Sequence, residues 1–449
     1  MSSVSGSAAG NPSGMTAASR TLGSHEHHWF QEPTEPAKKS FVFWLIVAQF
    51  IFFVALLGPA IVGIGLKILD LQHIGAVENT GAGLNSAQAI LGGVGALFAT
   101  LANVIFGRVS DRTTSRWGRR RIWIVLGTII MTIGFVFMAT GTSLLIATVG
   151  WAIAQLGANM TLAPFVATLA DQVPKFQRGK ITAALGIAQN AGIVGGVYVA
   201  GWFSFNLFIV FVIPSILAIG AMIVFAFVLP DKVLPVRPPR MSFGEILQTI
   251  WVSPVKEPDF ALAWWSRFLI TFASFGFTAF RFGYLINHLK VPEQEIGLLI
   301  ANTTLVYTGA LVVTAWLAGM LSDKIGKRKV FVWVATALFA VGTFALIFVQ
   351  DIPSYYILEL FLGAAYGIYV GVDLALVIDV LPNPDDSGKD LGVLNIANAL
   401  PQTLAPMIGG FVLLGTGGAN GSNYTVWFTL CAVAGLIGAV VIFPIKKVK

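Results

Sequence analysis

The sequence places opposite charges inside two long apolar stretches, where a lone charge is costly. Arg267 follows Asp259 by 8 residues, and Asp373 precedes Pro382 by 9 residues. A helical rise of about 1.5 Å per residue puts the two charges about 12 and 13 Å from the same end of their helices. Opposite charges at one depth should pair, because neither is tolerated alone. We expect a buried Asp373–Arg267 ion pair in which a proton competes with the guanidinium. A static structural pair is the alternative.

Further polar residues follow helical spacing in the stretch that contains Arg267. Thr271 and Ser274 share a face with Arg267, which makes their hydroxyls candidates for binding a solute. Arg281 lies 22 residues beyond Asp259, about 33 Å along a helix. We expect this long side chain to extend to the outer surface.

The stretch that contains Asp373 has a polar face of its own. Glu359, Tyr366 and Asp373 recur at intervals of seven residues, which places them on one side of a helix. A neighbouring stripe of small residues allows another helix to pack closely against this one. It consists of Gly363, Gly367 and Gly371.

A second, uncharged polar face is expected in the fourth apolar stretch. Thr148, Trp151, Gln155 and Asn159 recur at intervals of 3, 4 and 4 residues. Amides match the hydroxyls of a sugar, and an indole ring can stack on its C–H face. Hydrogen bonding between helices is the alternative use of such amides. The other candidate substrate-binding residues of this lining are Gln189, Asn190, Asn398 and Gln402.

The elements that carry these residues are membrane-spanning helices. Only 11% of the 449 residues are charged and 56% are hydrophobic, whereas a soluble domain carries roughly 25% charged residues. The apolar residues form two groups of six stretches, each long enough to cross a bilayer as a helix. We predict an all-α membrane protein whose twelve transmembrane helices form two pseudo-symmetric six-helix bundles. Its expected parts are a disordered cytoplasmic tail (1–40), an N-terminal bundle (41–229), a cytoplasmic linker with a surface helix (230–258) and a C-terminal bundle (259–449).

The distribution of positive charge predicts the orientation. Most of the 28 Lys and Arg residues fall in alternate loops and at the termini, and the positive-inside rule places those segments in the cytoplasm. We expect a plasma-membrane protein with both termini cytoplasmic. We expect the net charge of +7 to interact with anionic lipid rather than with nucleic acid. The cluster His25, His27 and His28 lies in the polar tail, so neither a metal site nor a cofactor is expected.

Two loop motifs occur twice, which indicates a duplicated six-helix unit. The first runs from Gly107 to Arg121, and its copy starts 212 residues later at Gly319. The second is Asp-x-x-Pro, which starts at Asp171 and again 208 residues later at Asp379.

These loops are expected to form a cytoplasmic latch between helices. Glycine lets two helix ends approach closely, and an aspartate there can pair with an arginine or with a helix N-terminus. If the arginines only enforced topology, the repeated Asp and Gly would be unexplained. The expected latch residues are Gly107, Asp111, Arg112, Arg119, Asp171, Arg178, Gly319, Asp323, Arg328 and Asp379.

The loop Ser110–Arg121 (SDRTTSRWGRRR) and its copy resemble the cytoplasmic loop motif of the major facilitator superfamily. The loop is also similar to that of sucrose–proton symporters and the related glycoside–pentoside–hexuronide transporters. The segment Leu391–Gln402 (LGVLNIANALPQ) resembles their eleventh helix. Melibiose-type members carry cation-binding aspartates in the first six spans. The corresponding stretches of this chain contain no acidic residue, which argues against sodium coupling.

This resemblance implies a secondary transporter that imports a sugar or glycoside with a proton by rocking two bundles. We expect a monomer whose partners are a small-molecule substrate, a proton and the lipid bilayer. No catalytic motif competes with this interpretation, so an enzyme is not expected. The alternatives are a proton-coupled exporter and a transporter of an organic anion such as a hexuronide. A membrane sensor is disfavoured, because the longest polar segment is the forty-residue tail.

Overall fold

The computed structural model describes residues 33–234, 257–380, 387–417 and 422–446, and the elements described there are helices. Twelve helical spans among these residues are long and apolar enough to cross a membrane. The first bundle comprises α2 (Lys39–Gly58), η1 (Pro59–Gly63), α3 (Ile64–His73), α4 (Gly81–Asp111), α5 (Arg121–Thr140), α6 (Leu144–Gln172), α7 (Lys175–Trp202) and α8 (Leu207–Val228). The second comprises α10 (Pro258–Asn287), α11 (Glu293–Ile325), α12 (Arg328–Ala345), η2 (Leu346–Phe348), α13 (Ile352–Val380), α14 (Ser387–Thr416) and α15 (Tyr424–Val441).

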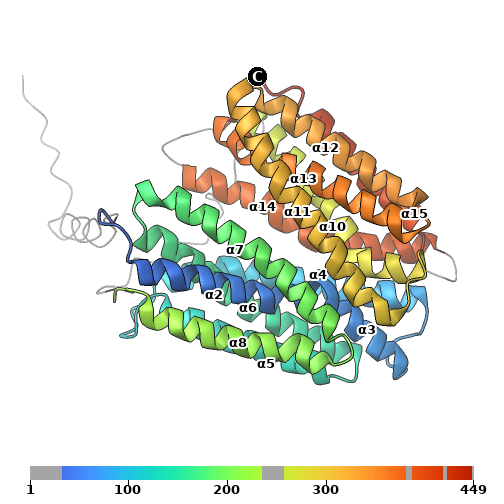
Figure 1. Ribbon diagram of the computed structural model, residues 1–449, viewed down its shortest axis with the longest axis horizontal. Helices are drawn as coiled ribbons and strands as arrows, with labels where there is room; N and C mark the ends of the chain where they lie inside the picture. The colour runs from blue at the N-terminus through green and yellow to red at the C-terminus, as the bar shows by residue number, and fades with distance from the viewer. Residues whose placement is uncertain (1–32, 235–256, 381–386, 418–421, 447–449) are drawn as a thin grey trace, which may run out of the picture.

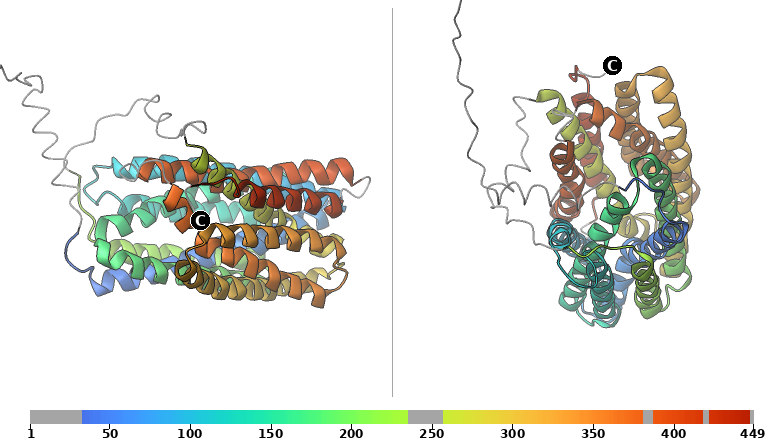
Figure 2. Two further views of the ribbon diagram at one scale, coloured as in Figure 1. Left: turned by 90° about the horizontal axis from the view of Figure 1, so that it is seen from above. Right: turned by 90° about the vertical axis from the view of Figure 1, so that its left-hand side faces the viewer.

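The helices run side by side along the long axis of the molecule, with α2–α8 below and α10–α15 above in Figure 1. The same packing is seen from two further sides in Figure 2. We name the two ends of the molecule by their residues. The basic end holds the loops with Arg119–Arg121 and Lys327–Lys329, and the opposite end holds His73, Asn206 and His288. The surface helix expected in the linker falls within residues 235–256, outside the described residues.

The first span is longer than its apolar stretch indicated. α2 continues through the π-helical turn η1 into α3, which ends at His73. Lys67 lies in α3 and is only 1% exposed. Its Nζ atom donates to Asp70 at 2.7 Å, and this pairing makes the buried charge tolerable. The first span therefore does contain an acidic residue, contrary to expectation.

Helix starts are fixed by short polar side chains at three loops. The side-chain oxygens of Thr80, Ser143 and Asn206 accept hydrogen bonds from backbone N–H groups in the first turns of α4, α6 and α8. These N–H groups have no partner within their own helix, so the caps satisfy them at the end of each span.

Glycine stripes set the closest helix contacts. On α13, a Cβ atom at Gly363, Gly367 or Gly371 would collide with the backbone of α11. The predicted close-packing face is therefore confirmed. In the first bundle, Gly58 of α2 meets the backbone of Gly196 on α7 in the same way. Because glycine has no side chain, the two backbones can approach closely, which is how membrane helices commonly associate.

The two bundles meet mainly along two helix pairs, α4 with α14 and α7 with α11, and α4 also contacts α10. Several polar contacts between the bundles lie toward the opposite end, and the shortest are these. Tyr424 donates to Asn85 at 2.9 Å, Tyr198 donates to Asn302 at 2.8 Å, and His73 Nε2 lies 3.1 Å from Glu293. Gly201 and Gly297 also bring the backbones of α7 and α11 into contact there. The opposite end is thus held together by contacts from both bundles.

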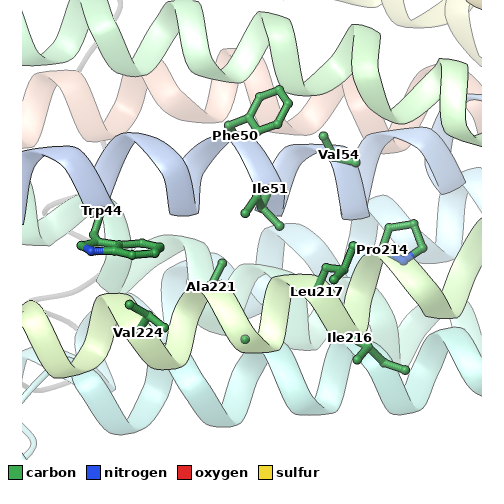
Figure 3. Close-up of a pocket in the computed structure, with 10 residues that line it drawn as sticks. Trp44, Phe50, Ile51, Val54, Pro214, Ile216, Leu217, Ala221 and Val224 are labelled. Carbon is green, nitrogen blue, oxygen red and sulfur yellow. The ribbon is translucent and has the colours of Figure 1, made fainter.

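An apolar groove of about 460 Å³ lies between α2 and α8. Figure 3 shows Trp44 and Ile51 on α2 facing Leu217 and Val224 on α8 across it. Its lining is almost wholly hydrocarbon, as expected for a surface that lies within a bilayer.

Candidate functional site

The structure brings Arg267 of α10 and Asp373 of α13 together. Arg267 Nε donates to Asp373 Oδ2 at 2.8 Å, and its terminal nitrogen Nη2 donates to the same oxygen. Both side chains are almost wholly buried, at 11% and 7% exposure. Two nitrogens of one guanidinium thus donate to a single carboxylate oxygen, and hydrogen bonds between ionised groups are stronger than neutral ones.

This pair is one of three pairs of facing residues between α10 and α13, and we call each such pair a rung. The helices run antiparallel, and the residue numbers of each rung sum to 640 because both stripes repeat every seven residues. The middle rung places Ser274 beside Tyr366. The third rung pairs Arg281 with Glu359, Nη2 to Oε1, at 2.8 Å. Successive rungs lie two helical turns apart, or about 10.5 Å.

Arg281 does not extend to the outer surface, contrary to expectation. It is 6% exposed, and its guanidinium is surrounded by oxygen atoms. It donates to Tyr355 at 3.0 Å, to Thr304 at 3.0 Å and to Thr303. Glu359, which had no predicted partner, supplies the compensating charge. The heptad spacing of both stripes was the available signal, since pairing one rung in antiparallel helices fixes the other two.

Aromatic hydroxyls surround the rungs. Tyr369 is buried beside Arg267 and Asp373, and its ring lies 5.8 Å from that of Tyr366. Tyr307 of α11 lies beside Ser274. Thr271, the other hydroxyl expected on this face, is 3% exposed. Both predicted hydroxyl residues of α10 are therefore buried within the second bundle.

The fourth span does not present Trp151 for stacking on a ligand. Its indole packs against Gly95 of α4 and Phe135 of α5, and the side chain is 3% exposed. The predicted stacking role is therefore not available in this structure. The reason is the absence of a side chain at Gly95, which opens a slot that the indole fills. The spacing of the residues predicted which face of α6 carries Trp151. It could not predict the gap beside Gly95 that the indole fills.

The amides of the fourth span are half-buried and link neighbouring helices. Asn103 of α4 donates to Asn159 at 3.3 Å, and Asn159 donates to the backbone of Gln155 at 3.0 Å. The hydroxyl of Thr148 donates a hydrogen bond to the backbone carbonyl of Leu144 in its own helix. Interhelical hydrogen bonding, the alternative use of these amides, therefore holds for Asn159.

The remaining candidate amides come from two further helices. Gln49 Nε2 of α2 donates to Gln189 Oε1 of α7 at 3.5 Å, and the buried Oε1 atom of Gln49 has no hydrogen-bond partner among the described residues. Asn190 bonds the backbone of its own helix, at Gly186. On α14, Asn398 and Gln402 are half-buried. Gln49 and Asn103 were not predicted: Gln49 is the one amide in its apolar stretch, and the polar residues around Asn103 show no clear helical stripe.

At the basic end of the first bundle, Arg120 binds two aspartates. It lies 2.6 Å from Asp111 and 3.0 Å from Asp171, and it also donates to Ser110 at 2.6 Å. The predicted Arg119 pairs with Asp171 at 2.7 Å. Arg120 was not among the predicted latch residues, yet its interactions occupy the centre of the cluster.

The second bundle repeats this cluster. Arg328 lies 2.7 Å from Asp379 and 3.1 Å from Asp323. Arg120 precedes Arg328 by 208 residues, the offset that relates Asp171 to Asp379. That offset was the signal that could have identified Arg120. In both bundles one arginine thus joins two aspartates at the same loop.

The other latch residues have different roles from those expected. Arg178 donates to the backbone carbonyls of Val173 and Ala170, at the end of α6. A Cβ atom at Gly107 or Gly319 would make only ordinary contacts, so close approach does not require glycine at either position. The conformationally special glycines lie later in the loops. Arg112 lies at the end of α4, where it forms the C-cap position.

Those later glycines adopt positive φ angles of 106° and 70° in the two loops, at Gly118 and Gly326. Only glycine adopts this conformation readily. The turn at Gly118 brings Asp231 against the start of α5, where it accepts hydrogen bonds from the backbone N–H groups of Arg120 and Arg121. A carboxylate at a helix N-terminus is electrostatically favourable.

None of the described residues forms a group of three or more His, Cys, Asp or Glu side chains with the geometry to hold a metal ion.

Comparison with known proteins gives two matches to the family model of the Major Facilitator Superfamily, over residues 43–288 and 282–449. One relative is the uncharacterized MFS-type transporter YfiU of Bacillus subtilis (strain 168), 32% identical over 25% of this chain and 21% of that protein. Another is the sugar transporter ERD6-like 15 of Arabidopsis thaliana, 26% identical over 40% of this chain and 35% of that protein. The alignments thus span a fifth to about a third of these relatives' lengths.

Two solved structures share the fold. A bacterial homolog of the human lysosomal transporter Spinster, in an inward-facing and unoccupied conformation, superposes with a TM-score of 0.67 at 16% identity. It covers 90% of this chain and 96% of that chain. The nucleoside transporter NupG superposes with a TM-score of 0.69 at 15% identity, over 91% of this chain and 100% of that chain. These relatives and neighbours are transporters, not enzymes.

Proposed function

Because this chain belongs to the Major Facilitator Superfamily, we propose that it is a secondary transporter that moves a sugar-like solute together with a proton. The observation that carries the proposal is the buried Arg267–Asp373 pair. It joins two helices of the second bundle inside membrane spans, where an ionised carboxylate requires its counter-charge.

Proton coupling follows from the chemistry of that pair. Protonation of Asp373 removes the charge that holds Arg267, and loss of one partner from a buried pair costs about 3–5 kcal/mol. A helix movement that separates the two groups therefore favours proton uptake on Asp373. Re-formation of the pair expels the proton. Transport is coupled if the solute-bound and empty proteins differ in the distance between these two groups.

A neutral, hydroxylated solute suits the polar residues best. The half-buried side chains Gln155, Gln189, Asn190, Asn398 and Gln402 offer amides, which both donate to and accept from hydroxyls. A curated relative is named a sugar transporter and a structural neighbour a nucleoside transporter, and nucleosides carry a sugar ring. Arg267 and Arg281 are both paired with carboxylates. This pairing disfavours the organic-anion alternative, because neither guanidinium is left to bind an anion.

Movement of the bundles against each other completes the mechanism. The contacts Asn85–Tyr424, Tyr198–Asn302 and His73–Glu293 hold the opposite end together. We assign this end to the outside and the basic end to the cytoplasm, on the positive-inside rule. The solute is then taken up when these contacts break, and it is released at the basic end after they re-form. The location in the plasma membrane and the direction of import are part of the same proposal.

Uptake into proteoliposomes tests this function. We expect labelled sucrose, or another neutral sugar of a panel that also contains a glucuronide and a nucleoside, to accumulate only under an inward proton gradient. The variant Asp373→Asn should lose accumulation but retain exchange of labelled for unlabelled solute, because a fixed neutral residue cannot cycle a proton.

The matched control is Glu295→Gln, which neutralises an exposed carboxylate at the start of α11. It should accumulate solute as the native protein does. Accumulation by Asp373→Asn against a gradient would overturn the coupling role, and uptake of the glucuronide alone would favour the organic-anion alternative.

A further inference from the structure

The groove between α2 and α8 opens onto the outer surface of the first bundle. Trp44 faces Val224 at one end of it, and Val54 and Pro214 lie at the other end (Figure 3). Leu217, in the middle of the lining, is 62% exposed. None of the described residues that line the groove carries a hydroxyl, amide or carboxylate group. The groove therefore suits a hydrocarbon chain and not a hydroxylated solute.

The length and position of the groove match one acyl chain of a lipid. From Trp44 to Val54 the lining spans 10 residues of α2, or about 15 Å. This is half of the ~30 Å hydrocarbon thickness of a bilayer, and therefore the depth of one leaflet. Trp44 follows Lys39, the first residue of α2, by 5 residues. The groove thus begins about 7.5 Å from the basic end of the helix and runs toward the middle of the membrane.

Positive charge gathers where the groove begins. The buried rings of Phe41 on α2 and Phe225 on α8 lie 5.9 Å apart at this end, so the start of α2 lies next to the end of α8. Three exposed lysines flank these two helix ends, namely Lys38, Lys39 and Lys232. The acidic residues of the same described segments are Glu35 and Asp231, and Asp231 is bound to the start of α5. A positive charge therefore remains at the mouth of the groove.

The lysines, and not the groove, must select the lipid. Acyl chains are as apolar as the lining, so burial of a chain here gives no hydrophobic driving force. A lysine near the membrane surface strengthens the binding of an anionic lipid by about fivefold, which corresponds to about 1 kcal/mol. Trp44 lies between the lysines and the rest of the groove, at the depth where tryptophans of membrane proteins are enriched.

We propose that this groove and the lysines at its basic end form a binding site for an anionic phospholipid. One acyl chain lies between α2 and α8, and the headgroup phosphate interacts with Lys38 and Lys39. The site lies on the outside of the first bundle, away from the Arg267–Asp373 pair, and it requires neither the solute nor the proton coupling proposed above.

Native mass spectrometry of the full chain tests this proposal without any solute. The protein is reconstituted in vesicles of equal parts phosphatidylglycerol and phosphatidylcholine, extracted in a mild detergent and weighed with its retained lipids. We expect phosphatidylglycerol to be retained in preference to phosphatidylcholine. Replacement of both Lys38 and Lys39 by glutamine should lower this preference about twenty-five-fold, fivefold for each lysine.

Gly220→Leu tests the groove itself. Gly220 lines the groove, and nothing lies within 4 Å of an added Cβ atom there. The leucine side chain can therefore fill the groove without a clash, and this variant should lose one bound lipid. Gly309→Leu on α11 is the matched control, because its Cβ position is equally open. Replacement of both Lys324 and Lys327 by glutamine is the control for charge, at the basic end of the second bundle.

Both controls should retain the lipid as the native protein does, and thermal unfolding establishes that each variant is folded. If Gly220→Leu keeps its lipid, the groove is not the site and the proposal is refuted. Equal retention of the two lipids by the native protein refutes selection by the lysines. A dimer that Gly220→Leu dissociates would show that a second copy of the chain covers the groove, which also overturns the proposal.

Discussion

Single arginines each organise a cluster of acidic residues in this protein. Arg120 is 4% exposed and binds Asp111, Asp171 and Ser110 at once. Arg328 does the same for two aspartates of the second bundle, but in a more exposed position, at 29%. Since solvent screens exposed pairs, the first cluster should matter more to stability than the second.

The first prediction at this scale concerns Arg120→Ala. Loss of this guanidinium leaves Ser110 and Asp171 with fewer partners in a buried site, and we expect the free energy of unfolding to fall by about 1–3 kcal/mol. Arg116→Ala, an exposed residue of the same loop, should change it little. Thermal unfolding in detergent measures both, and equal stability of the two variants would show that the Arg120 cluster is dispensable.

The residues of the site were predictable where one helix alone determines their position. Spacing placed Arg267, Asp373, Glu359 and Tyr366 on their faces, and a depth estimate brought the first pair together. Trp151 could not be placed in this way, because the slot that holds its indole exists only where Gly95 of another helix passes it. The same limit applies to Asn103, whose partner lies 56 residues away.

At the scale of the elements, α13 depends on its glycine stripe. The backbone of α11 lies directly against Gly363, Gly367 and Gly371, so a side chain at any of these positions pushes the helices apart. The hydropathy pattern predicted both helices, and the spacing of the glycines predicted this contact face. It did not predict that α2 would continue through η1 to His73, because the polar residues Lys67 and Asp70 satisfy each other there.

Gly367→Ala tests this packing. The added methyl group would meet the side chain of Thr314 and the backbone of Leu311, and overpacking of this kind costs about 1–3 kcal/mol. The control is Gly309→Ala on α11, where nothing lies within 4 Å of an added Cβ atom. Alanine is the better helix former by roughly 0.5–1 kcal/mol, so this variant should be neutral or more stable. A destabilised control, or an unaffected Gly367→Ala, would contradict the assigned contact.

At the scale of the whole molecule, the contact of α7 with α11 holds the two bundles together at the opposite end. Gly201 meets the backbone of Gly297 there, while Asn85 and Tyr424 bond between the bundles across the α4 side. Each bundle keeps its own arginine cluster at the basic end. One half can therefore rock against the other without rearrangement of either cluster.

Gly201→Leu should hold the opposite end open. The added side chain occupies the space of the Gly297 backbone, so the closed arrangement becomes unfavourable and solute transport should fall at least about tenfold, the factor for each 1.4 kcal/mol of lost closure. Labelling of an introduced Leu84→Cys, at a position of α4 that is 1% exposed in this structure, by an impermeant maleimide measures opening, and it should become faster in the Gly201→Leu background.

Gly186→Leu provides the control on the same helix, since nothing lies within 4 Å of its Cβ position. Transport and labelling should then match those of the parent protein. The native Cys431 is buried and should contribute little labelling. If Gly201→Leu labels slowly and transports normally, these contacts do not control opening.

In each of the three α10–α13 rungs the two residue numbers add up to 640. This fixed alignment of the two helices limits which insertions and deletions the protein can accept during evolution. A one-residue insertion or deletion between positions 267 and 281, or between 359 and 373, rotates the following side chains by about 100° and breaks a charge pair inside the bilayer. Exchange of acid and base between the two helices leaves the alignment intact. Functional descendants should therefore tolerate charge reversal across a rung more readily than any change of length within these segments.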